Sequence, residues 1–455
     1  MRNILIIGAG RSATSLIRYL IEKSSAENLH ITIGDISIES AQKLTKNHLN
    51  ATGILLDVFN KKQREEAVKA SDIVISMLPA RFHIEVAKDC ITFEKNLVTA
   101  SYISDEMQSL NEEVIDKGLV FMNEIGVDPG IDHMSAMQVI DTIRSKGGNV
   151  VLFESFTGGL IAPESDDNLW NYKFTWNPRN VVLAGQGGAA EFLQEGLYKY
   201  IPYNRLFRRT ELIKIKGHGE FEVYANRNSL KYQKVYGFKD ILTLYRGTIR
   251  RVGFSRAWNI FVQLGMTDDS YTIPNSEKLS YREYVNLFLP YSPTDSIELK
   301  LRHSLKIDQD DLIWKKLKEI DLFNGKKYLE IKNATPAQAL QKILMEKWAL
   351  AKEDKDMIVM YHKFGYELNG KNYQIDSSMV TIGEDQTYTA MSKTVGLPVA
   401  IAALQILNKK ITTPGVLRPI DKEVYKPILE ELETYGVQFN EEKKEYLGYN
   451  PDNLN

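Results

Sequence analysis

The sequence is short of several features that mark particular classes of protein. Its 455 residues contain one cysteine, Cys90, so no disulfide forms within the chain and a reducing compartment is expected. The formal net charge is only -2, so no overall field favours nucleic acid or a membrane surface as a partner. No uninterrupted apolar run reaches about 18 residues, and no signal peptide is expected. These absences favour a cytoplasmic protein that acts on small molecules.

A metal centre is not expected either. The seven histidines show no metal-ligand spacing. His83 and Cys90 are separated by a predicted helical stretch, and two groups make no site, so both are interpreted as structural. The acidic run from Asp308 to Asp311 lacks the glycine and the closing glutamate of a calcium loop, and is interpreted as a helix cap.

The clearest motif stands at the start of the chain. Ile4 to Ile7 is a short apolar run typical of a strand buried on both faces, and Gly8-Ala9-Gly10 follows it. Apolar residues then recur at helical spacing: Ala13, Leu16, Ile17, Leu20 and Ile21. A strand, a glycine turn and a helix begin a dinucleotide-binding unit, in which Gly8 permits the turn and Gly10 lets a pyrophosphate approach. The alternative is an ordinary strand–helix turn.

A second predicted strand ends at Asp35, and this residue bears on the choice of cofactor. An acid at this point binds the ribose 2′-OH of NAD and repels the 2′-phosphate of NADP. NAD is therefore favoured, although Arg11 in the glycine turn leaves NADP open. The alternative interpretation of Asp35 is a solvated acid at a strand end.

Predicted strands and helices alternate up to about residue 125. Six such strands indicate an α/β fold with a doubly wound parallel Rossmann sheet. Ligands bind at the carboxyl ends of the strands in such a sheet. The residues that follow the strands are therefore candidate contacts: Asp57, Val58, Leu78, Pro79, Ala100, Ser101, Tyr102, Asn123, Glu124, Ile125 and Gly126. Asp128, at a turn-rich junction, is either a ligand-facing acid or the cap of the next helix.

The rest of the chain predicts a second α/β domain with a mixed or antiparallel sheet and a helical insertion. Glu211–Lys216 and Glu220–Ala225 are expected to pair, and Asn369-Gly370 is typical of a type I′ hairpin turn. The very apolar stretch Val399–Leu407 is expected to be a helix that packs on the first domain. The predicted domains are a discontinuous Rossmann domain (1–127 with 391–455), a substrate-binding and dimerisation domain (128–254 and 353–390) and a helical insertion (255–352).

Several motifs resemble saccharopine dehydrogenase of the glutamate-forming type, also called saccharopine reductase, over essentially the whole chain. They are Ser101–Ser104, Met122–His133, Gly158–Glu164, Tyr172–Trp176, Arg246–Arg250, Lys393–Pro398 and Gly415–Leu417. The resemblance implies an NAD(P)-linked enzyme of lysine metabolism. Its reaction would be the reversible oxidation of saccharopine to L-glutamate and 2-aminoadipate 6-semialdehyde. It also implies a homodimer.

The resemblance further implies the ligand contacts. Those for the cofactor are Gly8, Gly10, Arg11, Ser12, Ala13, Asp35, Asp57, Leu78, Pro79, Ala100 and Ser101. Those for the substrate are Ser101, Tyr102, Asp128, Arg227, Thr248, Ile249 and Arg250, with Tyr102 and Asp128 as candidate catalytic residues. Two departures matter. Members that use NADP tend to carry an arginine where this chain has Asp35-Ile36, and a cysteine common before the Gly-Gly pair is Thr157 here.

The residue types fit such a substrate independently. Saccharopine carries three carboxylates, and guanidinium groups bind carboxylates bidentately. Arg227, Arg246 and Arg250 are candidates, although each alone is equally typical of a surface arginine. No histidine is clearly placed as an acid or base, His133 being nearest to the motif, so the site is expected mainly to position the substrate. Two alternatives stay open: a carboxynorspermidine- or homospermidine-type dehydrogenase, against which the arginines argue, and a non-catalytic NAD-binding protein.

Overall fold

The computed structural model describes residues 1–184 and 186–446, which form two compact units. The first comprises Met1–Val150, Tyr366–Asn372 and Met379–Glu442. The second comprises Val151–Gly365, Tyr373–Ser378 and, among the described residues, 443–446. The first unit extends past residue 127, the domain limit expected from the sequence, because helix α7 (Ile131–Ser145) packs on α16 (Lys422–Thr434). Residues 447–455, assigned to the Rossmann domain from the sequence, lie outside the described residues.

The first unit contains a parallel sheet with the strand order β15-β6-β5-β4-β1-β2-β3, which confirms the predicted doubly wound fold. The strands are β1 (Arg2–Ile7), β2 (Leu29–Asp35), β3 (Ala51–Leu55), β4 (Ile73–Ser76), β5 (Asn96–Thr99), β6 (Val120–Met122) and β15 (Gly415–Leu417). The expected number of six strands was wrong. The seventh strand, β15, has only three residues and directly follows Pro414. Its pairing with β6 is what distinguishes it from a loop.

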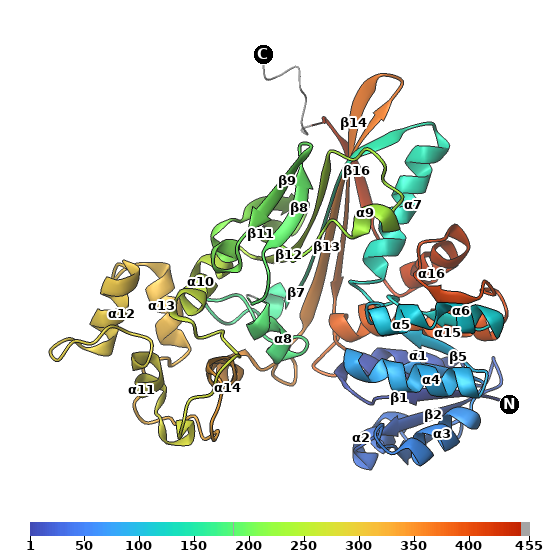
Figure 1. Ribbon diagram of the computed structural model, residues 1–455, viewed down its shortest axis with the longest axis horizontal. Helices are drawn as coiled ribbons and strands as arrows, with labels where there is room; N and C mark the ends of the chain where they lie inside the picture. The colour runs from blue at the N-terminus through green and yellow to red at the C-terminus, as the bar shows by residue number, and fades with distance from the viewer. Residues whose placement is uncertain (185, 447–455) are drawn as a thin grey trace. The chain divides into compact units, whose positions relative to one another are not determined.

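Helices cover this sheet, and the C-terminal part of the chain supplies some of them, drawn in orange and red in Figure 1. They are the short η1 (Arg11–Ala13) and η2 (Ala80–Phe82), α1 (Thr14–Lys23), α2 (Ile38–Thr45), α3 (Lys61–Lys69), α4 (His83–Thr92), α5 (Asp105–Ser109), α6 (Asn111–Asp116), α7, α15 (Ala390–Leu407) and α16. Because α15 packs on α1, β4 and β5, the nucleotide-binding unit draws on both ends of the sequence.

Helix α15 is longer than predicted. It begins at Ala390 rather than near Val399, and it continues through Pro398. The Thr389 side chain caps it by accepting the Ser392 N–H, and Gly396 lets α1 approach. A Cβ at Gly396 would lie 2.9 Å from the backbone nitrogen of Leu16. In length and composition α15 would suit a membrane span, but 72% of it is buried inside the protein, as in a core helix.

A buried ion pair joins α3 to α4. Arg64 Nε donates to Asp89 Oδ2, and Arg64 Nη1 donates to the carbonyl oxygen of Val58. Both charged side chains are almost fully buried. The pair therefore fixes the loop that follows β3 to the body of the sheet.

The second unit is built on a nine-stranded sheet whose main path runs β10-β11-β12-β7-β13-β14-β16. Its strands are β7 (Asn149–Ile161), β8 (Ala190–Gln194), β9 (Leu197–Ile201), β10 (Glu211–Ile215), β11 (Gly219–Ala225), β12 (Thr243–Arg251), β13 (Asp356–Leu368), β14 (Lys371–Ile382) and β16 (Asn440–Lys444). It is mixed, as predicted, because β12 pairs with β7 in parallel and with β11 antiparallel. The turn between β13 and β14 has positive φ at both Asn369 and Gly370, as a type I′ turn requires.

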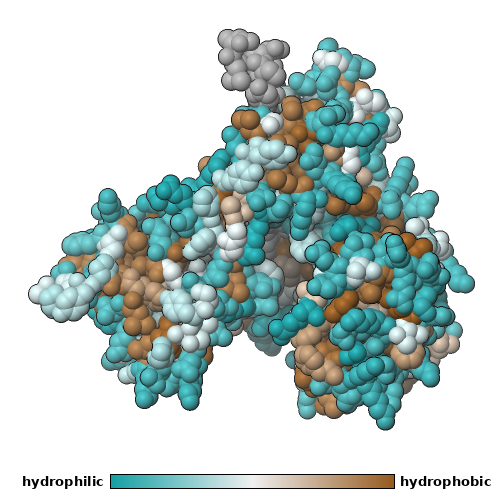
Figure 2. Space-filling view, in the orientation of Figure 1, coloured by the Kyte–Doolittle hydropathy of each residue, from teal (hydrophilic) through white to brown (hydrophobic). Residues whose placement is uncertain are grey.

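Helices account for much of the stretch predicted as an insertion. The helices of this unit are η3 (Pro163–Ser165), α8 (Pro178–Leu183), η4 (Tyr203–Arg208), α9 (Tyr232–Val235), α10 (Phe254–Leu264), η5 (Ser276–Lys278), α11 (Tyr281–Asn286), α12 (Ile297–Leu305), α13 (Leu312–Glu319) and α14 (Pro336–Trp348). Asp311 caps α13, which confirms the predicted helix cap. Figure 2 shows that hydrophobic residues reach the visible surface in separate patches among hydrophilic ones.

Candidate functional site

A cavity of about 310 Å³ opens in the first unit, at the glycine turn and the carboxyl ends of β1 to β4. Its lining is Ile7, Gly8, Gly10, Gly34, Asp35, Ile36, Leu56, Asp57, Val58, Phe59, Met77, Leu78, Pro79 and Phe82. The structure thus brings together six of the predicted cofactor contacts: Gly8, Gly10, Asp35, Asp57, Leu78 and Pro79. The position agrees with the rule that ligands bind outside the carboxyl ends of parallel strands.

The two glycines of the turn differ in what requires them. Gly8 has φ +109°, and a Cβ there would lie 2.9 Å from the carbonyl oxygen of Met77, so the chain itself requires glycine. A Cβ at Gly10 would meet no atom within 4 Å. Gly10 therefore leaves open space beside the backbone, which is what a bound pyrophosphate needs. The geometry of the turn fits a dinucleotide.

Asp35 is tied to the turn through both carboxylate oxygens. Oδ2 accepts the N–H of Ala9 at 2.7 Å, and Oδ1 accepts the N–H of Ser37 at 2.9 Å. Each oxygen keeps further acceptor capacity for a ribose hydroxyl. Asp35 is therefore more than a solvated acid at a strand end, because it holds the glycine turn in place.

The other predicted cofactor contacts do not line this cavity. Arg11, Ser12 and Ala13 form η1, in which Arg11 is exposed and Ala13 is buried where η1 packs on α15. Ala100 and Ser101 follow β5 outside the cavity. In contrast, the sequence missed two aromatic residues. The Phe59 and Phe82 rings meet edge to face at 5.0 Å within the lining, and only the nearness of Phe59 to Asp57 in sequence signalled it.

Ser101 is held by a buried histidine that was not predicted as a site residue. The Ser101 Oγ atom lies 2.7 Å from His83 Nε2, and His83 Nδ1 lies 2.8 Å from Ser76 Oγ. Burial lowers the pKa of His83 to about 4, so its imidazole is neutral near pH 7. A neutral imidazole has one donor and one acceptor nitrogen, which connects the two hydroxyl groups.

The two candidate catalytic residues contact each other. Tyr102 Oη donates to Asp128 Oδ1 at 3.1 Å. The alternative role of Asp128 as a helix cap is wrong, because Asp132 Oδ1 accepts the Gly130 N–H where α7 begins and no side chain caps that helix. Tyr102 is 45% exposed, so its hydroxyl group and the carboxylate beside it are accessible to solvent.

Glu124, one of the residues expected to face a ligand at a strand end, instead connects the segments that carry these residues. Glu124 is 2% exposed. Its carboxylate accepts hydrogen bonds from the Ile103 N–H at 3.1 Å, from Arg418 Nε at 2.9 Å and from His133 Nε2 at 3.0 Å. Burial alone would raise the pKa of Glu124, but His133 and Arg418 outweigh it and lower the pKa. The backbone N–H of Glu124 also donates to the Ser101 carbonyl. Hydrogen bonds to Glu124 therefore hold the backbone on both sides of Tyr102.

In the second unit, every second side chain of β12 points to the same face of the sheet. Arg246, Thr248 and Arg250 therefore share one face. Arg246 is buried with its guanidinium 4.0 Å from the centre of the Tyr232 ring. Thr248 Oγ1 donates to Asn226 Oδ1 at 2.8 Å. Ile249 is fully buried, so its side chain offers no surface to a ligand.

Arg250 is a buried cation whose charge no described carboxylate neutralises. The residue is 4% exposed, and its guanidinium lies among the rings of Tyr172, Tyr224 and Phe254 at 5.1 to 5.8 Å. Nη1 donates to the Ile249 carbonyl, and Nε has no hydrogen-bond partner. Its cross-strand neighbour Glu222 accepts instead from the N–H groups of Gly253 and Ser255. A buried cation without a counter-ion is costly, so an anionic ligand would stabilise it.

Arg227 is exposed and differs from Arg250 in its setting. Its Nη2 atom donates to the Leu183 carbonyl at 3.1 Å, and the guanidinium lies beside Gly187. This contact orients the side chain while leaving other donors of the guanidinium available.

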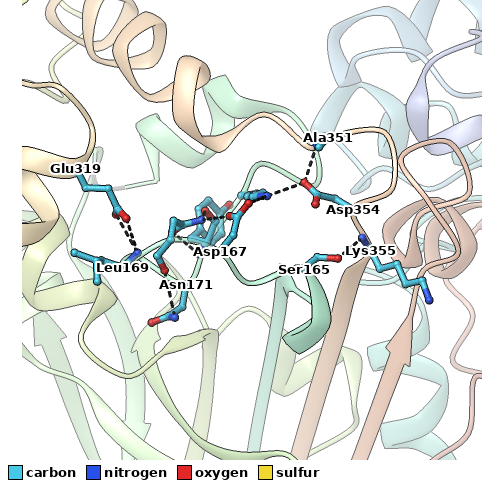
Figure 3. Close-up of polar contacts among 11 residues, drawn as sticks. Ser165, Asp167, Leu169, Asn171, Glu319, Ala351, Asp354 and Lys355 are labelled. Carbon is cyan, nitrogen blue, oxygen red and sulfur yellow. Dashed lines mark hydrogen bonds and ion pairs between the residues drawn. The ribbon is translucent and has the colours of Figure 1, made fainter.

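The loop that carries Tyr172 is fixed by the polar contacts drawn in Figure 3. Lys173 Nζ donates to Asp167 and to Asp354 at 2.8 Å each. The carboxylate of Glu319 accepts the Leu169 N–H, as the figure shows. These contacts hold the Tyr172 ring beside Arg250. Within the ranges that the structure describes, no group of three histidine, cysteine or acidic side chains is arranged to hold a metal ion.

Two family models match the chain. One is described as the saccharopine dehydrogenase NADP binding domain and matches residues 4–122; the other is described as the saccharopine dehydrogenase C-terminal domain and matches residues 126–437. The chain belongs to the saccharopine dehydrogenase family. A family relative from Schizosaccharomyces pombe, named saccharopine dehydrogenase [NADP(+), L-glutamate-forming], is 33% identical over 97% of this chain and 99% of its own length.

Solved and longer family members extend this result. The structure of the apo L-Glu-forming saccharopine dehydrogenase of Saccharomyces cerevisiae matches with a TM-score of 0.89 and 31% identity, covering 98% of this chain and 100% of that one. The mouse protein named alpha-aminoadipic semialdehyde synthase, mitochondrial, is 33% identical over 96% of this chain. This chain spans about half the length (47%) of that relative. The buried Oγ1 of Thr157, where the resemblance led us to expect a cysteine, has no hydrogen-bond partner among the described residues.

Proposed function

We propose that this protein is an NAD(P)-dependent saccharopine dehydrogenase of the glutamate-forming type. It would reversibly oxidise saccharopine to L-glutamate and 2-aminoadipate 6-semialdehyde in lysine metabolism. The observation that carries the proposal is Arg250, a buried cation without a carboxylate partner among the described residues, in a chain whose other unit has a dinucleotide cavity. A substrate with three carboxylates supplies the missing charge.

The residues have separate tasks in this proposal. Arg250 and Arg227 bind substrate carboxylates, since guanidinium groups do so through paired hydrogen bonds. The carboxylate of Asp128 holds the secondary amine, and the hydroxyl group of Tyr102 orients that carboxylate. The bound dinucleotide would supply the hydride acceptor. Since Asp128 and Tyr102 position the substrate, its own amine carries the proton.

The positioning role of Tyr102 and Asp128 is testable. We expect Tyr102→Phe and Asp128→Asn to lower turnover by less than about 10³-fold, because general acid–base groups contribute roughly 10²–10⁴ and a positioning group less. The measurement is kcat and KM for saccharopine at saturating cofactor. A loss beyond that limit with unchanged KM would assign acid–base chemistry to the residue.

We also propose that the protein prefers NAD to NADP, although relatives carry NADP in their names. Asp35 places a negative charge at the cavity, and Ile36 stands where an arginine would bind a 2′-phosphate. We expect Ile36→Arg to raise kcat/KM for NADP by about tenfold or more, since one charge-assisted bond is worth roughly 1.5–3 kcal/mol. Ile36 is 72% exposed, so the change costs little stability.

Leu55→Arg is the matched control for this cofactor test. Leu55 is also exposed, so an arginine there adds the same charge near β2. Leu55 does not line the cavity. The ratio of kcat/KM for NAD and NADP should stay unchanged in Leu55→Arg. An initial preference of the unaltered protein for NADP would refute the assignment to NAD.

Two other functions make different predictions. A carboxynorspermidine- or homospermidine-type dehydrogenase acts on a polyamine, for which buried Arg250 is unfavourable. A non-catalytic NAD-binding protein would bind dinucleotide without turnover. Formation of NADH or NADPH with saccharopine, compared with carboxynorspermidine, separates the three. We further propose a cytoplasmic homodimer, which light scattering of the purified chain and its location in the cell would test.

A further inference from the structure

A row of buried polar groups leads from the middle of the parallel sheet to Ser101. Ser76 ends β4, His83 begins α4, and Ser101 follows β5. His83 Nδ1 lies 2.8 Å from Ser76 Oγ, and Nε2 lies 2.7 Å from Ser101 Oγ and 3.3 Å from Thr99 Oγ1. The three segments are joined by side chains as well as by the sheet.

Packing alone does not call for these residues. His83 is 4% exposed and Ser76 is fully buried, so an apolar pair of similar volume would avoid the cost of burying polar groups. A satisfied polar network instead fixes the orientation of its members. The Ser101 carbonyl also accepts the Glu124 N–H, so backbone and hydroxyl group are both held.

We infer that His83 is a positioning residue that fixes the Ser101 hydroxyl group for ligand binding. The inference rests on the proposed function, for which the family resemblance implies that Ser101 contacts the cofactor and the substrate. The neutral imidazole forms one hydrogen bond with Ser101 Oγ, as donor or as acceptor. This bond fixes the rotation of the Ser101 hydroxyl group before a ligand arrives. A hydroxyl group oriented in advance binds a carboxylate or carboxamide without further loss of rotational freedom.

Two conservative variants separate the nitrogens. In His83→Asn the amide takes the place of Nδ1, so the contact with Ser76 is kept and that with Ser101 is lost. In His83→Gln the amide reaches the place of Nε2, so the contact with Ser101 is kept. We expect His83→Asn to weaken ligand binding about tenfold, as the loss of one buried hydrogen bond implies, and His83→Gln to recover most of that loss.

A double-mutant cycle with Ser101→Ala identifies the route of the effect. Because His83 acts through the Ser101 hydroxyl group, His83→Asn should change affinity by less than about twofold when Ser101 is alanine. The dissociation constants of NADH and NADPH from their fluorescence, and the KM for saccharopine, are measured in all four proteins. The same tenfold effect in both backgrounds would overturn the inference, as would unchanged affinity for every ligand in His83→Asn.

Val86→Ala is the control for general destabilisation of α4. Val86 is fully buried in the same helix and does not contact Ser101 through any polar atom, so its truncation should lower thermal stability without changing ligand affinity. The failure of the proposed function is distinguishable. If the unaltered protein binds dinucleotide but not saccharopine, the function is refuted, while the dinucleotide affinities still decide the role of His83.

Discussion

Arg250→Met should lower kcat/KM for saccharopine by at least about 100-fold while leaving dinucleotide affinity unchanged. Methionine keeps much of the apolar volume among Tyr172, Tyr224 and Phe254 but removes the charge. The loss of a buried charge-assisted contact to a carboxylate corresponds to roughly 3 kcal/mol or more. Steady-state kinetics with saccharopine and fluorescence titration with NADH measure the two effects.

The adjacent residue supplies the matched control. Arg251 alternates with Arg250 along β12 and so faces the other side of the sheet, where its Nη1 contacts the His218 carbonyl and its guanidinium lies over Phe221. Arg251→Met removes the same charge and should leave kcat/KM for saccharopine within about twofold. Equal losses in both variants would mean that overall charge, rather than a carboxylate contact at Arg250, determines substrate affinity.

Asp89→Asn should lower the free energy of unfolding by about 3–5 kcal/mol. The change leaves the guanidinium of Arg64 buried without its main counter-ion, and breaking a buried pair has a cost of this size. Because Arg64 also donates to the Val58 carbonyl beside the cavity, NADH affinity should fall as well. Urea unfolding followed by circular dichroism, together with NADH titration, checks both effects.

Glu85→Gln is the control for this ion pair. Glu85 lies 3.7 Å from the same guanidinium, but its side chain is 48% exposed, so its removal should cost less than about 1 kcal/mol. If Asp89→Asn were no more destabilising than Glu85→Gln, the buried pair would contribute little, and the loop after β3 would be held by its other contacts.

The parts of the site that the sequence predicted depend on local patterns. Gly8, Gly10 and Asp35 follow strands at fixed intervals, and the alternation of strands and helices places the ends of those strands at one edge. Short-range spacing was therefore sufficient for the first six strands of the parallel sheet and for part of the lining of one cavity. It did not predict that Asp35 also accepts the Ala9 N–H, because that contact depends on how the turn folds back.

The contacts that the sequence did not predict depend on tertiary structure. Glu124 meets His133, Arg418 and the Ile103 N–H, and Arg418 lies 294 positions further along the chain. No periodicity relates such positions. His83 similarly begins a short helix with ordinary amphipathic spacing, so only its contacts with two serine hydroxyl groups distinguish it from a core histidine.

Helix α15 shows how packing overrides local preference. Pro398 and Gly396 both disfavour the interior of a helix, which is why the sequence predicted a later start. The absence of a side chain at Gly396 instead allows close approach to α1, and burial of the helix outweighs the local cost.

The contact at Gly396 also bears on the order of events during synthesis. Helix α1 ends at Lys23, whereas its partner α15 begins only at Ala390 and is therefore synthesised much later. The apolar side of α1 that α15 covers therefore remains exposed until α15 has been synthesised. A nascent chain arrested before residue 390 should depend on chaperones, and a fragment that ends there should not form a soluble nucleotide-binding domain.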